Sequence, residues 1–288
     1  MSRFRFVDDH RDTYEVKRLC ELVEVSRQGY YAWRSRPTSA RAIADGELLE
    51  EIRRIHLESR CTYGAPRIHG QLRRRGHQIG CKRVARLMRN DGLMGVHKRK
   101  WRRRRPDIAP APDRLNRDFT AARPNQRWVA DISEFPTGEG KLHVAGVRDL
   151  CHRGLVGWSM GPSPDADLVV DALVMALGRA EPDAEGLVHH SDKGGAYVSG
   201  DFCSMADLAG LQVSFGSTGD CYDNAAMETF WSTLKREIAW IRGSIYFPTR
   251  HDARLYLFEF IEVFYNRQRH QARLGHRTPV EFAASFNP

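Results

Sequence analysis

The feature that most constrains the fold of this 288-residue chain is an alternation of short strand-like and helix-like segments that begins near residue 125. Strand-like runs rich in β-branched and apolar residues are predicted at 127–135, 142–150, 154–160, 186–191 and 211–215. Helices are predicted at 166–180, 199–209, 222–242 and 249–267. Three successive strands followed by alternating helices and strands indicate an α/β fold, with a mixed five-stranded sheet flanked by helices.

Residues 220–241 form the most regular helical segment of this region. Apolar side chains recur there at the spacing of one helix face, at Met227, Phe230, Leu234, Ile238 and Ile241. This face is therefore expected to lie against a core. Glu228 falls on the margin of that stripe, together with Asn224, Trp231 and Lys235, because spacings of three, four and seven residues return to nearly the same side. Taken alone, Glu228 is more simply explained as an ordinary residue at the edge of a core than as a metal ligand.

Two further acids follow strand-like runs. Asp131 comes after residues 127–130 and Asp192 after residues 187–191, and thirty-five residues separate Asp192 from Glu228. Acids at strand ends lie where α/β sheets usually place ligands. Two carboxylates on strands and one on a helix could hold divalent cations, and hard oxygen ligands suit Mg²⁺. Three other acids remain rival ligands, although capping or a loop position explains the last two more simply: Asp149, Asp220 and Asp223.

A histidine pair, His189 and His190, directly precedes this second acid. The alternation of side chains along a strand predicts that one ring points inward and the other outward. A catalytic role for either ring stays open beside the simpler reading as strand residues. Gly194 and Gly195 are expected to shape the following turn rather than to cradle a phosphate.

The composition narrows the class of protein. A hydrophobic content of 41% in 288 residues is enough for a core and for two domains. No apolar run reaches the roughly 18 residues of a membrane span, and no signal peptide is recognisable. The six cysteines form no C-x-x-C pair and no finger spacing with histidine, so we expect reduced thiols without structural zinc in a soluble cytoplasmic protein.

The positive charge is concentrated in the first part of the chain. The net charge of +9 combines +15 over residues 1–124 with −6 over residues 125–288. Residues 60–105 alone hold 16 basic residues and a single acid, Asp91. Such a density favours a polyanionic partner, because each neutralised phosphate releases counterions. A solvated basic face without a partner is the alternative explanation.

The basic region contains a pattern typical of a DNA-binding helix-turn-helix. Pro66 is expected to open a first helix that ends at Gly76, and a second helix is expected between Gly80 and Gly92. Two short helices joined by a glycine-containing turn fit this motif. The second helix exposes the candidate DNA-binding residues Lys82, Arg83, Arg86 and Arg89.

A basic arm follows this helix pair. It carries Trp101, which could stack on a base or sugar, and the candidate DNA-binding residues Lys98, Arg99, Lys100, Arg102, Arg103, Arg104 and Arg105. We predict four segments: an N-terminal helical segment that could include another helix-turn-helix (1–40), a helix-turn-helix DNA-binding domain with the arm (41–105), an extended proline-containing linker (106–124) and an α/β core with a C-terminal helix (125–288). Ser26 is expected to cap a helix within the first segment.

With these residues in place, the chain resembles the OrfB-type DDE transposases of bacterial insertion sequences, which share a ribonuclease H-like core with retroviral integrases. The resemblance covers nearly the whole chain. It rests on residues 128–133 around Asp131, on residues 190–194 around Asp192, and on residues 222–225 leading to Glu228 and Lys235, with the spacing of the last two acids as the family hallmark. Residues 63–68 and the closing segment that includes Tyr265 and Arg269 also match.

The resemblance implies an integrase-type catalytic core in which Asp131, Asp192 and Glu228 are both catalytic residues and metal ligands. It further implies two Mg²⁺ ions, with Mn²⁺ able to substitute, and Asp131 bridging them. Lys235 and Asn224 would then meet DNA near the scissile phosphate. The implied partners are double-stranded DNA, as element ends and as target, further copies of the chain assembled on DNA, and an upstream-frame fusion partner, all at the bacterial nucleoid.

Two other functions remain open at this point. One is a DNA-binding repressor that retains the fold without catalysis, which the intact acid triad disfavours. The other is a metal-dependent nuclease without strand transfer, which shares the metal site but leaves the basic N-terminal third unexplained.

Overall fold

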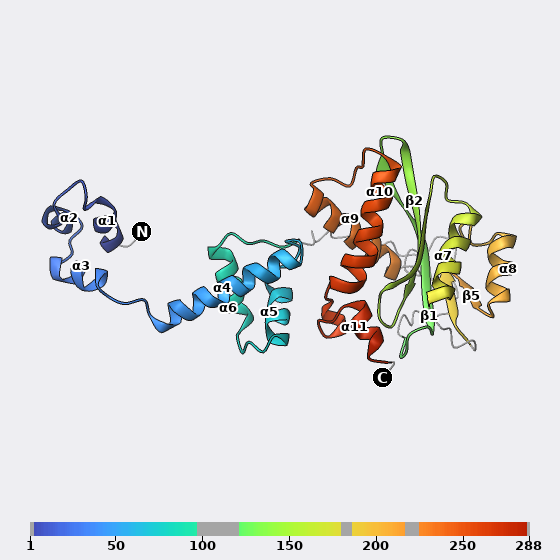
Figure 1. Cartoon of the computed structure of the whole chain (residues 1–288), viewed down its shortest axis with the longest axis horizontal. Helices are drawn as coiled ribbons and strands as arrows, with labels where there is room; N and C mark the ends of the chain where they lie inside the picture. Colours follow the sequence, from blue (N-terminus) through green and yellow to red (C-terminus); the bar gives the residue numbers. More distant parts are fainter. Residues whose placement is uncertain (1–2, 97–120, 180–185, 217–224, 287–288) are drawn as a thin grey trace, which may run out of the picture. The chain divides into compact units, whose positions relative to one another are not determined.

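The computed structural model describes residues 3–96, 121–179, 186–216 and 225–286 (Figure 1). The chain divides into two compact units, residues 1–51 and 52–288, and the division falls within helix α4 (Ala40–Glu58). The basic arm and most of the expected linker lie outside the described residues. The four segments expected from composition therefore remain predictions.

The first unit begins with three short helices. They are α1 (Arg3–His10), α2 (Val16–Leu22) and α3 (Arg27–Arg34). Their small shared core consists of Val7, Leu19, Cys20 and Tyr30. Ser26 caps α3 as predicted, since its Oγ accepts a hydrogen bond of 2.9 Å from the Gly29 N–H. Helix α1 was not expected, because its eight residues mix charged and aromatic side chains without a clear apolar period.

The helix pair predicted from the basic region is confirmed. It consists of α5 (Ala65–Arg74) and α6 (Cys81–Asn90). Both helices are followed by glycines with positive φ, Gly76 at 90° and Gly92 at 71°, in the left-handed region that ends a helix at low cost. The apolar faces are buried as expected, through Ile68 and Leu72 on α5 and Val84, Leu87 and Met88 on α6.

The predicted mixed five-stranded sheet is also confirmed. Its strands are β1 (Arg127–Thr137), β2 (Gly140–Asp149), β3 (Leu155–Gly161), β4 (Val188–Ser191) and β5 (Gln212–Phe215). The order across the sheet is β3-β2-β1-β4-β5. The first three strands are antiparallel, and β4 and β5 run parallel to β1. This is the ribonuclease H-like α/β arrangement, with β1 at its centre.

Helices cover both faces of the sheet (Figure 1). On one face lie α7 (Ala166–Arg179) and α8 (Gly200–Leu208), packed on Trp128, Ala130 and other residues of that face. On the other face lie α9 (Ala225–Arg242), α10 (Arg250–Glu259) and their continuation, packed on Val129 and Phe135. Because neighbouring residues of β1 enter different cores, the side of each side chain follows from its position in the strand.

The helix expected at 249–267 is only partly α-helical. After α10 the chain continues as a π-helix, η1 (Phe260–Gln268), and then as a 3₁₀ turn, η2 (Ala272–Leu274), and α11 (Pro279–Ala284). The wider turn coincides with Asn266, whose amide accepts from the Leu155 N–H (3.1 Å) and donates to the Leu155 carbonyl (3.0 Å). This buried pairing with the first residue of β3 is a tertiary contact that helical periodicity does not reveal.

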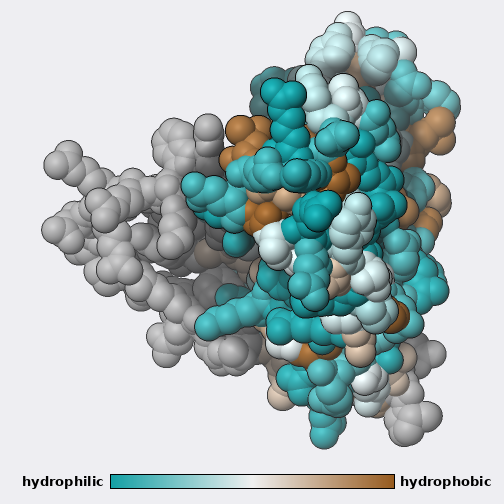
Figure 2. All heavy atoms as spheres, turned by 90° about the vertical axis from the view of Figure 1, so that its left-hand side faces the viewer, coloured by the Kyte–Doolittle hydropathy of each residue, from teal (hydrophilic) through white to brown (hydrophobic). Residues whose placement is uncertain are grey.

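One face of the molecule is mostly polar. On the face drawn in Figure 2, hydrophilic residues predominate and hydrophobic residues form small separate patches. Large exposed apolar side chains occur along the chain, for example Leu22, Leu57 and Leu208. Within the ranges that the structure describes, no helix has the length and apolar character needed to cross a membrane.

Candidate active site

The strand register brings the first two acids together. In the parallel β1–β4 pair, Trp128 lies opposite His189 and Val129 opposite His190. If this register is extended by two residues, Asp131 is level with Asp192, and the charge of Asp192 does act on Asp131. Val129 belongs to the core under α9, so the alternation of side chains places Asp131 on the α9 side as well.

The expectation that both acids sit at strand ends is half right. Asp192 directly follows β4, which ends at Ser191, whereas β1 continues six residues beyond Asp131 to Thr137. The extension pairs with β2 as a long antiparallel hairpin. Asp131 therefore lies inside a strand, where it pairs with Gly146 of β2, rather than at a strand end.

A glycine allows α9 to approach this strand closely. Gly146 of β2 is the partner of Asp131, and a Cβ at Gly146 would lie 3.1 Å from the ring of Trp231. The buried Trp231 thus covers the sheet directly beside Asp131. Its indole Nε1 makes no hydrogen bond to any described residue, yet it lies near enough to the Asp131 carboxyl to favour the charged form.

Asp131 is the electrostatic centre of the site. Burial, followed by the charges of Asp192 and then Glu228, raises the pKa of Asp131 to about 7. Asp192 is exposed and is oriented by the Gly194 N–H, which donates to its Oδ1 at 3.0 Å. Glu228 is exposed in the first turn of α9. An acid whose ionisation is opposed by two neighbouring acids is part of a donor set that bound cations would stabilise.

This donor set fits hard divalent cations but is not closed around one ion. Over the described ranges no three or more His, Cys, Asp or Glu side chains are arranged to hold a single metal. In the expected two-ion arrangement, each ion would bind only two of the three carboxylates. Mg²⁺ accepts few protein carboxylates and retains several waters, so an open donor set suits it.

The predicted apolar stripe of α9 is confirmed, with Met227, Phe230, Leu234 and Ile238 buried and Ile241 packed at the edge of the core. Lys235 lies on the margin of this stripe, half buried, with its Nζ 5.3 Å from the centre of the Phe135 ring. Burial lowers the pKa of Lys235, while Glu134 and Asp131 oppose that change. The ammonium therefore lies in the field of the acids. Asn224, expected beside it, falls outside the described residues.

Of the rival ligands, Asp149 has a structural role. Its side chain is fully buried and accepts hydrogen bonds from the N–H groups of Asn125 (2.7 Å), Cys151 (2.8 Å) and His152 (3.0 Å). These bonds close the turn after β2 and leave the carboxylate occupied. Asp220 and Asp223 lie outside the described residues.

The expectation that one histidine ring points outward is wrong. His189 and His190 are 0% and 1% exposed. Their side chains do point to opposite faces of the sheet, but helices cover both faces. His189 packs against Phe202 and Tyr197, and burial lowers its pKa to about 4. His190 Nδ1 lies 3.1 Å from the Ser214 hydroxyl.

The candidate DNA-binding residues of the helix pair lie on the outer side of α6. Lys82, Arg86 and Arg89 are exposed and Arg83 is half buried, while Val84 and Leu87 face inward. Residues 98–105 of the arm are not described. The structure thus places a basic face on the outer side of α6.

Several arginines of the basic region contact the α/β core instead. Buried Glu237 of α9 binds Arg269 through bonds of 2.7 and 2.8 Å and Arg67 of α5 at 3.3 Å. Arg60 pairs with Glu259. Sequence reasoning missed these pairs. The only signal was an acid, Glu237, one residue from a stripe position of an amphipathic helix.

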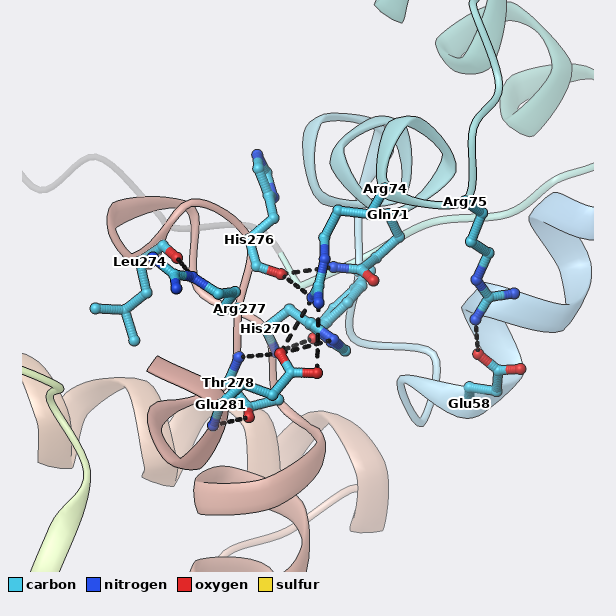
Figure 3. A network of polar contacts seen from close by, with 11 residues as sticks. Glu58, Gln71, Arg74, Arg75, His270, Leu274, His276, Arg277, Thr278 and Glu281 are labelled. Carbon is cyan, nitrogen blue, oxygen red and sulfur yellow. Dashed lines mark hydrogen bonds and ion pairs between the residues drawn. The ribbon is translucent and has the colours of Figure 1, made fainter. Parts of the chain in front are cut away.

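A second group of polar contacts joins α5 to the closing segment (Figure 3). Arg74 and Gln71 both donate to the His276 carbonyl, at 2.7 and 3.1 Å, and Arg74 also pairs with Glu281 at 3.2 Å. Glu281 in turn belongs to a capping box with Thr278 at the start of α11. The helix pair is therefore hydrogen-bonded to the α/β core within one compact unit.

Comparison with known protein families agrees with this arrangement. Residues 44–101 match the HTH-like domain family, and residues 121–221 and 209–279 match the integrase core domain. Over 289 residues the chain is 35% identical to "Transposase InsF for insertion sequence IS3A" of Escherichia coli (strain K12), covering 97% of this chain and 98% of that protein. The chain belongs to the integrase-core transposases of bacterial insertion sequences.

This transposase has a second similar relative, the "Insertion element IS600 uncharacterized 31 kDa protein" of Shigella sonnei. The two are 39% identical over 272 residues, which cover 93% of this chain and 98% of the relative. Among solved structures, the magnesium complex of the HTLV-2 integrase catalytic core domain shares 12% identity at a TM-score of 0.44, covering 57% of this chain and 99% of that one. The family expected from the acid motifs is confirmed, and its HTH-like domain implies DNA as the partner.

Proposed function

We propose that this transposase cuts the ends of its own element and joins the resulting 3′-hydroxyl to target DNA, with Asp131, Asp192 and Glu228 as the catalytic acids. The observation that carries the proposal is the partly buried Asp131 carboxyl beside the other two acids, which with burial raise its pKa to about 7. A strongly raised pKa of an acid beside two other acids is typical of functional sites.

Each acid would have a distinct task. Asp131, on the central strand, would contribute to both cation sites, with Asp192 completing one and Glu228 the other. Two Mg²⁺ or Mn²⁺ ions, when held by these acids, would lower the pKa of the attacking water or hydroxyl and would stabilise charge on the leaving oxygen. The close packing of Trp231 on Gly146 fixes the distance of α9 from the sheet and excludes water from that side of Asp131.

The basic residues would hold the substrate in register with the acids. Lys235 lies in the field of Asp131 and would contact a phosphate next to the scissile bond, as would Asn224. The exposed residues of α6 and the basic arm would hold the element end. Assembly of several copies on paired ends, and fusion to an upstream-frame product, belong to the same proposal.

The decisive experiment uses Asp192→Asn with a labelled end fragment. We expect this substitution to abolish both cleavage and strand transfer, because it removes one cation ligand, while the fragment is still retained in a gel-shift assay. Asp207→Asn, an exposed acid on α8, is the matched control and should leave activity unchanged. Full residual activity of Asp192→Asn would refute the site.

Joining to a second DNA distinguishes this proposal from a nuclease. With Mn²⁺ and a target plasmid, the wild-type protein should yield covalently joined products from pre-cut ends. Cleavage without any joined product would indicate a nuclease, and binding without either reaction would indicate a repressor.

A further inference from the structure

A positively charged cavity lies beside the first turn of α9, apart from the three acids. A cavity of about 220 Å³ opens between α9, the end of β2 and the segment after η1. Five arginines reach its wall, and we call it the arginine pocket: Arg67, Arg148, Arg153, Arg269 and Arg273, with the Thr229 hydroxyl beside them. Because Thr229 directly follows Glu228 on α9, the pocket borders the helix turn that carries the third acid.

The arginines of the pocket are only partly neutralised. Glu237 pairs with Arg269 and Arg67. Arg148 is 3% exposed and donates only to neutral oxygens, the carbonyls of Arg153 (3.1 Å) and Ala226 (2.9 Å) and the Tyr265 hydroxyl (3.2 Å). In the part of the chain that the structure describes, no carboxylate lies within ion-pair distance of Arg148, Arg153 or Arg273.

This concentration of positive charge affects the pKa of Arg153. Burial, followed by the neighbouring guanidinium groups of Arg148, Arg273 and Arg269, lowers the pKa of Arg153 to about 10. An arginine is otherwise charged at all ordinary pH values. Cations that repel each other in a partly buried cavity are stabilised by an anion that enters it.

The donors suit a phosphate oxyanion. Arg148, Arg67 and Arg269 are held by the protein and contribute mainly their charge. Arg153 and Arg273 retain accessible surface and have no hydrogen-bond partner for their side chains among the described residues. Guanidinium groups bind phosphate through two parallel hydrogen bonds, and a threonine hydroxyl adds a third donor.

We propose that the arginine pocket binds a backbone phosphate of the DNA, with Arg153 and Arg273 donating to its oxygens and Thr229 completing the site. The assignment to DNA rests on the proposed function. A strand that crosses the first turn of α9 would meet Glu228 on one side and Thr229 on the other. The pocket would then fix the path of the strand relative to the acids without contacting a base.

The first test measures anion binding by the full chain without DNA. Inorganic pyrophosphate should bind the wild-type protein in isothermal titration calorimetry, and Arg153→Gln and Arg273→Gln should each weaken it by roughly tenfold, because each removes a charge-assisted hydrogen bond. Arg254→Gln, an exposed arginine of α10, is the control and should bind as the wild type does. Equal binding by all four proteins would overturn the site.

The second test asks whether DNA supplies the phosphate. The salt dependence of binding to a double-stranded end fragment should fall in slope by about 0.9 for each phosphate that the protein no longer neutralises, so both pocket variants should show a smaller slope than the wild type. Asp192→Asn should keep the full slope, which separates this outcome from a failure of the catalytic proposal. An unchanged slope in variants that no longer bind pyrophosphate would mean a free-anion site and overturn the assignment to DNA.

Discussion

At the scale of single residues, the charge of Asp131 is unfavourable for folding, although Asp131 is one of the candidate metal ligands. It is largely buried beside two other acids, and no arginine or lysine pairs with it among the ion pairs of the described residues. Its charge also acts on the half-buried Lys235, whose charged form it favours. An acid in this position costs folding free energy when no cation is bound, which is typical of residues retained for chemistry.

Asp131→Asn should therefore stabilise the metal-free protein while abolishing catalysis. The folded-state pKa is raised from 3.8 to about 7, so the folded protein binds more protons than the unfolded chain across that window. Stability should fall as the pH rises from about 4 to about 7 and stay low above it. Thermal unfolding in EDTA should show this slope for the wild type, a flatter profile for Asp131→Asn, and a gain of about 1–3 kcal/mol at pH 8. A variant less stable than the wild type at pH 8 would contradict this explanation.

The pKa of Glu237 is shifted in the opposite direction to that of Asp131. Burial alone would raise its pKa, but Arg269 and Arg67 more than compensate and hold the pKa below its usual value. Both Glu237 and Arg269 are nearly inaccessible, at 2% and 4% exposed. This acid stabilises the fold only through its cations, since a buried charge without a partner is costly.

Glu237→Gln should thus destabilise the protein by about 3–5 kcal/mol, because it leaves Arg269 buried and uncompensated. Urea unfolding at pH 7 measures the loss. Glu134→Gln provides the comparison, since its pair with Lys141 is exposed on both sides and should contribute little to stability. A similar decrease in the free energy of unfolding for the two variants would show that burial does not make the Glu237 ion pair more important for stability.

At the scale of elements, the fit of α9 on the sheet depends on Gly146. This residue pairs with Asp131 across β1 and β2 and leaves room for the Trp231 ring. A side chain there would push α9 outward, and with it Glu228. The geometry of the acids is therefore set by a residue that carries no functional group.

Gly146→Val should reduce cleavage by at least tenfold while the protein still binds DNA, because displacement by even 1 Å misplaces a catalytic group. Gly178→Ala in α7 is the matched control, as its Cβ would meet no neighbour within 4 Å. Normal cleavage by Gly146→Val would show that α9 is positioned by other contacts.

At the scale of the whole molecule, the basic region serves two purposes. Some of its arginines form ion pairs within the protein: Arg60, Arg67 and Arg74 bind acids of the α/β core. The rest lies on α6 and in the arm. The helix pair is consequently part of the same compact unit as Asp131, Asp192 and Glu228.

Gly70→Ala tests this packing. A Cβ at Gly70 of α5 would lie 2.2 Å from the His276 ring, so the ring or the helix must move, at a cost of about 1–3 kcal/mol. The substitution should increase hydrogen exchange in residues 272–278. Gly46→Ala in α4 has no neighbour within 4 Å and should stabilise its helix by up to about 1 kcal/mol. Unchanged exchange in Gly70→Ala would indicate that His276 moves aside freely.

Much of the architecture could be predicted from local patterns. The five strands, the stripe of α9 and the Ser26 cap each depend on residues close together in sequence. The proximity of Asp131 and Asp192 depends on the pairing of β1 with β4, which no local pattern reveals. The burial of both His189 and His190 could not be predicted this way, because it depends on helices that cover both faces of the sheet.

The sequence by itself determined the class of fold, the family and the candidate acids, because periodicity, turn residues and motif spacing are local properties of the chain. Other features depend on the tertiary structure. These are the division of the arginines between solvent and ion pairs, the π-helical turn at Asn266, and the packing of Trp231 of α9 on Gly146. The physical reason is that these features arise from contacts between segments distant in sequence, where the energy of a buried charge or a close approach depends on the partner that folding brings to it.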